Sequence, residues 1–296
     1  MKLNKLVLTI FVLFSQLLNS KALACASCGS GNGDPLILYP NETLKLYVGT
    51  RYLDISDHIR ADGILAPNYL AANQMFLDLG LGYRLTQNLF ANVYSGIQMN
   101  QGSQSHKINF QETLFKARLT LWEQDHHYPW LPQVQLLAGY KPNFAKDKYT
   151  SADPELLDVF GNGHQEFHLG YDIWNSMYAI IGGISQTLIL PLPREIDGAK
   201  VYPGIGIGSV ATIGVFYSGS NKLILGYSLN LRSRREENDA EIDQSQSRNH
   251  AIFVAADYAV NLKTSIRASI SFSGLSKSTN TTRTNSFVAS INQTLF

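Results

Sequence analysis

Apolar and polar residues alternate along most of this 296-residue chain, in short segments separated by turns or polar loops. A period of two places one set of side chains on one face of a β-strand and the other set on the opposite face. The clearest segment is 222–232, whose apolar face is formed by Leu223, Leu225, Tyr227, Leu229 and Leu231. The pattern predicts an all-β protein.

Segments of this kind recur along the chain, and we expect about twelve strands. They are predicted at 43–56, 72–85, 88–98, 108–122, 133–143, 164–173, 177–189, 203–217, 222–233, 249–261, 263–274 and 285–296. The strands at 177–189 and 203–217 carry the weakest alternation, because glycines interrupt them.

The connections between these strands alternate in length. Short connections are expected near 85–88, 174–176, 218–221 and 261–263, and longer polar ones near 57–71, 99–107, 144–163, 190–202, 234–248 and 275–284. The connection 123–132 is long but belongs to the short series. Transmembrane barrels have short periplasmic turns and long extracellular loops. The sequence therefore predicts a transmembrane antiparallel up-and-down β-barrel in the bacterial outer membrane.

Charged residues fall on the polar face of the predicted strands. A membrane barrel turns its polar face to the lumen, whereas a small soluble barrel fills its interior with apolar side chains. The candidate lumen-lining residues are Lys45, Arg51, Asp78, Arg84, Glu112, Lys116, Arg118, Glu166, His168, Asp172, Lys222, Asp257 and Arg267.

Aromatic residues near strand ends are typical of the girdles of membrane barrels. The candidates here are Tyr52, Tyr83, Trp122, Tyr140, Trp174 and Tyr258. The predicted strands also have the length of roughly 9–11 residues that a tilted strand needs to cross a bilayer. A soluble β-sandwich with one wet face is the alternative.

The overall charge excludes one class of partner. Charged residues make up 16% of the chain and the net charge is +1, so there is no basic field to attract nucleic acid.

Residues 1–24 have the features of a secretory signal peptide. Lys2 and Lys5 precede an apolar stretch, and Ala22–Ala24 forms a cleavage site that would leave Cys25 first. A retained anchor helix is the alternative. Residues 25–42 are expected to form a periplasmic segment that could fold into the lumen as a plug, and residues 43–296 to form the barrel.

Cys25 and Cys28 are the two cysteines of the chain. A close pair in an oxidising compartment is expected to form a disulfide, but two thiolates can also bind a soft metal ion or take part in redox exchange. Acylation of Cys25 is a third alternative, because Leu23-Ala24-Cys25 partly matches a lipoprotein processing site. Gly29 follows Cys28, so covalent haem is excluded.

Two stretches resemble a known family. The residues Leu131-Pro132-x-Val134-x-Leu136-x-Ala138-Gly139-x-Lys141-Pro142 and then Gly161-x-Gly163-x-x-Glu166-Phe167-x-Leu169-Gly170 are similar to outer-membrane barrel proteins of the phenol meta-pathway type. The resemblance implies a barrel that acts as a transporter or channel. The final Phe296 resembles part of the assembly signal of outer-membrane barrels.

No catalytic motif is present, and we expect neither an enzyme nor a cofactor. His164 and His168 would lie about 13 Å apart on one strand, too far to share a metal ion. The loop with Arg234 and Arg235 followed by acids is interpreted as solvated, with contacts to lipopolysaccharide phosphates as the alternative.

The sequence favours a passive channel or facilitator for small solutes in contact with outer-membrane lipid and lipopolysaccharide. The alternative is a non-conducting barrel that anchors a periplasmic redox or metal-handling protein through Cys25 and Cys28.

Overall fold

The computed structural model describes residues 36–38, 42–67, 73–102, 105–124, 128–196 and 198–295. In this part of the chain, twelve antiparallel strands form one closed wall. The wall strands are β1 (Leu44–Ile59), β3 (Asn73–Arg84), β4 (Leu89–Gln101), β6 (Leu114–Trp122), β7 (Gln133–Lys141), β8 (Glu166–Met177), β9 (Ile180–Pro191), β12 (Gly206–Ser218), β13 (Asn221–Arg232), β16 (Ser247–Ala259), β17 (Thr264–Ser273) and β18 (Thr281–Thr294).

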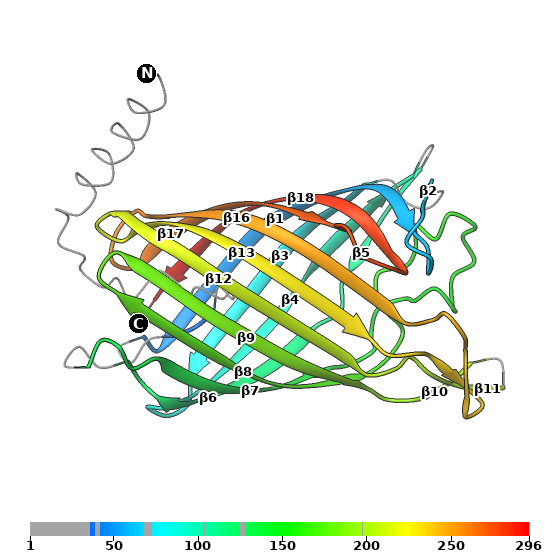
Figure 1. The fold of residues 1–296 in the computed structure, drawn as a ribbon, viewed down its shortest axis with the longest axis horizontal. Coiled ribbons are helices and arrows are strands. Elements are labelled where there is room, and N and C mark those ends of the chain that lie inside the picture. The colour runs from blue at the N-terminus through cyan, green and yellow to red at the C-terminus, as the bar shows by residue number, and fades with distance from the viewer. Residues whose placement is uncertain are drawn as a thin grey trace, which may run out of the picture.

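Shorter strands extend this wall at one end. β2 (Leu65–Pro67) pairs with β1, and β5 (His106–Phe110) pairs with β4. A separate four-stranded sheet is built from β10 (Arg194–Ile196), β11 (Ala199–Tyr202), β14 (Glu236–Glu237) and β15 (Ala240–Glu241). We call the end that carries these strands the loop end and the opposite end the turn end (Figure 1).

The first and last wall strands close the barrel. β1 pairs antiparallel with β18 from Lys45 opposite Thr294 to Ile59 opposite Thr281, with one register shift between Ile55 and Asp57. Every other wall strand pairs with its neighbours in sequence order (Figure 1). Full closure leaves no free edge in the wall, which a membrane-spanning sheet requires because lipid offers no hydrogen-bond partners. The predicted fold class is confirmed.

One predicted strand, 108–122, is wrong because it is broken at residues 111–113. β5 ends at Phe110 and β6 begins at Leu114. Polar contacts inside the barrel hold the break: the Gln111 side chain donates to Asp78 at 2.8 Å, and the Glu112 carboxylate lies 2.7 Å from Lys141 Nζ.

The turn predicted at 174–176 is also wrong, because β8 continues to Met177 and the chain reverses at Tyr178–Ala179. Asn175 does not form its own turn. Its amide nitrogen donates to the Pro129 carbonyl at 3.0 Å, and its oxygen accepts from Gln124 at 3.2 Å. Tyr178 takes the positive φ of 54° that the reversal requires.

Connection 123–132 lies at the turn end, as predicted.

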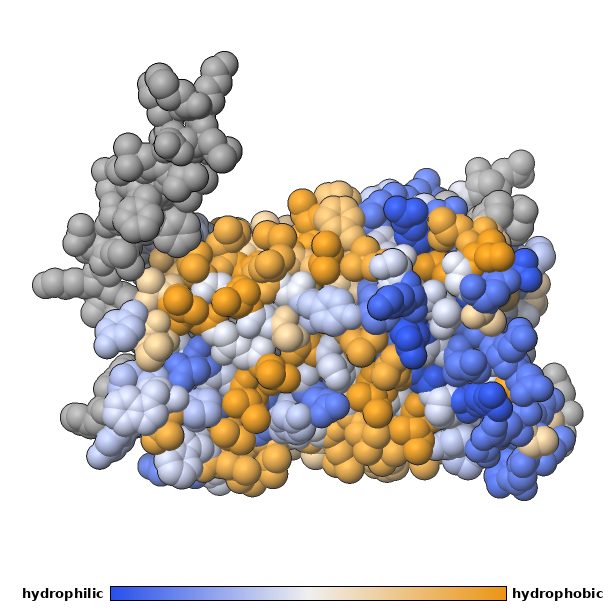
Figure 2. All heavy atoms as spheres, in the orientation of Figure 1, coloured by the Kyte–Doolittle hydropathy of each residue, from blue (hydrophilic) through white to orange (hydrophobic). Residues whose placement is uncertain are grey.

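The outer surface is apolar over the middle of the barrel and polar at the loop end (Figure 2). Leu225 is 54% exposed and Ile270 is 41% exposed, so the apolar set of the alternating strands faces outward. This is the arrangement of a barrel in lipid and the reverse of a soluble one. Among the described residues there is no helix long and apolar enough to cross a membrane.

Aromatic side chains are exposed where the strands meet the turn end, including Tyr83, Trp122 and Tyr258. Trp174 does not belong to this girdle, and that prediction is wrong. It is buried, because it lies two residues beyond Asp172 and therefore shares the inward face of β8.

Candidate functional site: the charged lumen

The candidate charges lie on the inner face of the wall, where they group by height. Most of those near the turn end are buried, with Arg84 as the exception. Near the loop end Glu166 is buried, and the cations around it are partly exposed.

A triad of charges lies near the turn end, on β13, β16 and β17. Asp257 receives two hydrogen bonds from Arg267, at 2.5 Å from Nε and 2.8 Å from Nη2, and lies 3.5 Å from Lys222 Nζ. Arg118 on β6 and Asp172 on β8 form a further buried ion pair. Charges this well buried persist only with such partners, because desolvation is costly.

The segment before β1 enters this same end of the lumen. Leu36, Ile37 and Leu38 are buried, and Ile37 and Leu38 pack with Phe90. Lys45 Nζ donates to the Ile37 carbonyl at 3.0 Å and lies 3.3 Å from Glu42.

Two glycines of β3 provide the space for this segment. A Cβ on Gly80 would lie 2.7 Å from Leu36 Cδ1, and one on Gly82 would lie 2.7 Å from Leu38 Cδ1. The Glu42 carboxylate accepts a hydrogen bond from Thr294 at 2.7 Å, and its carbonyl accepts one from Arg84 at 2.8 Å. Residues 36–38 and 42 thus fill part of the turn end, and the plug formed by residues 25–42 stays a prediction.

At mid-height, Arg51 on β1 binds Asp78 on β3 through two hydrogen bonds of 3.1 and 3.2 Å. The Arg51 guanidinium also lies 4.0 Å from the centroid of the Phe76 ring. Lys116 Nζ lies 4.9 Å from the centroid of the Tyr94 ring. These contacts fix the position of each cation.

A larger cluster lies near the loop end around Glu166. Its carboxylate is 2.8 Å from Lys141 Nζ, 3.0 Å from Arg232 Nη2 and 3.4 Å from His168 Nε2. Lys141 also binds Glu112 at 2.7 Å. Arg232 is on β13 and Glu166 on β8, so this ion pair spans β12 and β9. Neither of those two strands contains a charged residue.

The connection 142–165 folds back toward the lumen and covers part of the loop end. Asn100 on β4 donates to the carbonyls of Leu157 and Val159, at 2.9 and 2.8 Å. Leu157 is fully buried. The backbone N–H of Asn162 donates to Glu112 at 2.8 Å. This loop therefore reaches from β7 and β8 across to β4.

Ion pairs hold the same loop. Burial alone would raise the pKa of Asp147, but hydrogen bonds from Arg194 and from the backbone N–H groups of Tyr149 and Thr150 hold it below its ordinary value. The hydrogen bond from Lys107 lowers the pKa of Asp153. Asp158 is paired with Lys146, and its pKa is also lowered despite desolvation.

The described histidines lie apart from one another. His164 lies in the loop rather than on β8, where it was predicted, because Gly163 turns the chain with a φ of +83° and Asn162 caps the His164 N–H. Burial lowers the pKa of His164. Within the described part of the chain, no group of three or more His, Cys, Asp or Glu could hold a metal ion. Cys25, Cys28, His126 and His127 lie outside the described residues, as do the signal segment and Phe296.

Sequence reasoning missed several members of the site. Lys141 and Arg232 lie on predicted strands, and the alternation that selected Glu166 would have selected them too. Asp147, Asn162 and Arg194 carried no such signal, because they lie in or beside a long loop whose path depends on contacts distant in sequence.

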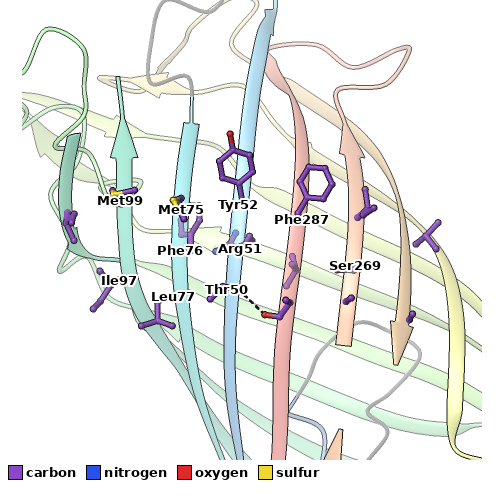
Figure 3. A pocket seen from close by; sticks show the side chains of 17 residues that line it. Thr50, Arg51, Tyr52, Met75, Phe76, Leu77, Ile97, Met99, Ser269 and Phe287 are labelled. Atoms are coloured by element: carbon purple, nitrogen blue, oxygen red, sulfur yellow. Dashed lines mark hydrogen bonds between the residues drawn. The ribbon is translucent and has the colours of Figure 1, made fainter. Parts of the chain in front are cut away.

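A hollow of about 840 Å³ lies on the outer face over β16, β17, β18, β1, β3 and β4 (Figure 3). Small side chains form its floor in a row of cross-strand neighbours: Ala256, Ala268, Ala289 and Thr50. Large apolar side chains such as Tyr52 and Phe287 flank the row. The hollow faces lipid and is not part of the lumen.

An apolar exterior, a charged interior and a closed wall together define a transmembrane β-barrel of the outer-membrane type. The fold is similar to that of an outer-membrane channel from Pseudomonas putida F1, with a TM-score of 0.68 and 11% identity over 88% of this chain and 98% of that one. It is also similar to the translocator domain of the autotransporter NalP from Neisseria meningitidis, with a TM-score of 0.50 and 9% identity over 97% and 98% of the two chains.

A more distant likeness is to the monoaromatic hydrocarbon channel CymD, with a TM-score of 0.47 and 8% identity over 86% of this chain and 89% of that one, too low to carry an argument. No family model matches the sequence, and no curated relative does either. The resemblance to the phenol meta-pathway type thus stays a prediction beyond the outer-membrane barrel class. A channel and a translocator share this fold, so function has to be argued from the lumen.

Proposed function

We propose that this barrel is a passive channel or facilitator for small solutes across the outer membrane. The observation that carries the proposal is the partly exposed charged lining of the loop-end half of the lumen. The side chain of Arg51 is 33% exposed and that of Arg232 is 32% exposed, although both point inward. An inner surface that water reaches from the loop end is what a solute pathway requires.

Most of the inward charged side chains near the turn end are buried. Lys45, Lys222 and Asp172 are each 2% exposed or less, and Leu36–Leu38 pack beside them. Conduction through this end therefore needs a movement of residues 36–38 and 42 or a rearrangement of these ion pairs. The contact between Lys45 and the Ile37 carbonyl is the one most directly placed to control such a movement.

The test is electrical conductance of the purified full chain in planar lipid bilayers. We expect discrete ohmic steps, which become larger or more frequent in the variant Lys45→Gln because the segment loses its charged anchor. Heat-modifiable migration on gels would verify that both proteins are folded barrels. Folded protein that conducts no current, with or without Lys45→Gln, would contradict the proposal and favour a scaffold for a periplasmic partner.

A further inference from the structure

We propose that the solutes this channel passes are small anions, collected by the loop-end half of the lumen. The inference rests on the proposed function and adds a substrate class to it. It concerns inorganic anions and organic acids that a lysine or arginine side chain can bind. Two independent observations support it, one on the composition of the inner face and one on which charges water can reach.

The inner face carries more basic than acidic side chains. The wall strands contribute nine inward cations, namely Lys45, Arg51, Arg84, Lys116, Arg118, Lys141, Lys222, Arg232 and Arg267. The acids that face them are Asp78, Glu166, Asp172 and Asp257 on the wall strands, with Glu112 and Glu42 beside them. Asp147, Asp153 and Asp158 of loop 142–165 are each paired with a cation from outside the wall strands, so these pairs leave the excess unchanged. The whole chain has a net charge of only +1, so the positive excess is specific to the interior.

The exposure of the ion pairs points the same way. The Arg51 side chain is 33% exposed but that of Asp78 only 17%. Arg232 is 32% exposed against 3% for Glu166, and Arg194 is 31% exposed against 2% for Asp147. The same order holds for Lys141 with Glu112, for Lys146 with Asp158 and for Lys107 with Asp153.

This order is not simply a result of the greater length of basic side chains. In the ion pairs that Lys200 and Arg234 form in and beside β11, β14 and β15, outside the barrel, the order is reversed. Asp239 is more exposed than its partner Lys200, and Glu241 and Asp243 are more exposed than Arg234. The surface around the loop-end entrance of the lumen therefore presents cations, whereas the outlying sheet presents acids.

The electrostatic consequence is a positive potential inside a low-dielectric wall. A cleft lined by one sign of charge concentrates counter-ions and speeds their entry. The buried acids keep the cations in fixed positions, so a passing anion meets guanidinium and ammonium groups that are already oriented. Arginine suits carboxylate and phosphate oxygens because its planar fork donates two hydrogen bonds at once.

The experiment is the reversal potential of the purified full chain in a planar bilayer that separates two concentrations of potassium chloride. Low ionic strength is needed, because salt screens the charges. We expect chloride to be more permeant than potassium. The double variant Arg51→Gln, Arg232→Gln should shift the reversal potential toward that of an unselective pore, and Asp78→Asn should shift it in the opposite direction.

Arg234→Gln is the matched control, because it removes an arginine from an ion pair outside the barrel and should leave the reversal potential unchanged. A conducting pore that prefers potassium, or one whose selectivity the double variant leaves unaltered, would overturn the anion proposal while the channel function stands. Absence of current from folded wild type and from Lys45→Gln would overturn both.

Discussion

The buried charges near the turn end are the residues on which the stability of the lumen depends most. Asp257 faces two cations, Lys222 and Arg267. All three side chains are at most 10% exposed. Such a group contributes little net stability as a unit, but removal of one member leaves uncompensated charge in a poorly solvated place.

We therefore predict that Asp257→Asn lowers the free energy of unfolding by about 3–5 kcal/mol. Urea titration in lipid vesicles, followed by tryptophan fluorescence, would measure this loss. Asp62→Asn is the control, because Asp62 forms an exposed pair with Arg60 and its removal should cost no more than about 1 kcal/mol. An equal loss in the two variants would show that burial of the triad has no energetic effect.

The sequence predicted the orientation of a single side chain correctly where the residue lies on a regular strand. Alternation alone places Arg51 and Asp78 on the inner face, and the structure pairs them across β1 and β3. It could not assign partners, because partners depend on register between strands. Trp174 was assigned to the lipid face from its position near a strand end, although its spacing from Asp172 indicated the lumen.

The element with the most direct influence on the lumen is the short segment that precedes β1. Its entry depends on the two glycines of β3 that face it, because a side chain there would occupy the space of Leu36 and Leu38.

We predict that Gly80→Val displaces this segment and raises conductance without loss of the barrel. The added atoms would begin 2.7 Å from Leu36 Cδ1, closer than carbon atoms can approach. Single-channel recording would measure the effect, and Gly182→Val on β9 is the control for glycine replacement, because the nearest atom to an added Cβ there is the Thr212 carbonyl oxygen at 3.5 Å. Unaltered conductance in Gly80→Val would show that the segment does not limit flow.

The loop 142–165 should respond to acid. Asp147, Asp153 and Asp158 have pKa values below their ordinary 3.8 in the folded loop, so the released loop binds more protons than the folded one. Their contribution to stability is therefore present at neutral pH and is lost as pH falls below about 4. His164 also destabilises the folded loop as the pH falls below 6.5, its ordinary pKa. Burial lowers the pKa of His164 because it disfavours the protonated form.

We thus predict that amide exchange protection of residues 142–165, corrected for the intrinsic rate, falls on acidification while the wall strands keep theirs. In the variant Arg194→Gln protection should already be lower at neutral pH and should fall less on acidification, because Asp147 then lacks its main cationic partner and its pKa is less depressed. Protection that stays constant between neutral pH and pH 4 and below would contradict the assignment of these ion pairs.

For the molecule as a whole, the outward apolar band determines where the protein resides. Leu225 lies at mid-strand on β13 and Leu121 near the turn end of β6, and both are exposed outward. We predict that Leu225→Arg destabilises the barrel in lipid by about 2–4 kcal/mol, and that Leu121→Arg costs about 1 kcal/mol or less, because the penalty falls toward the interface. Equal costs in vesicle unfolding experiments would contradict this placement in the bilayer.

The architecture could be predicted from sequence because period-two alternation and alternating loop lengths are local signals. The break between β5 and β6, the inward fold of loop 142–165 and the particular contacts of Leu36–Leu38 could not. Each depends on contacts between residues distant in sequence, such as Asn100 with Leu157 and Lys45 with Ile37.

The ion pair between Arg232 and Glu166 joins two strands that are not neighbours, with β12 and β9 between them. Three strand spacings separate its ends along the wall, an arc of roughly 14 Å, so the pair forms a chord of the circular cross-section. Widening the barrel at this height would stretch the chord. At this height the width of the lumen therefore depends on one charged contact as well as on the number of strands.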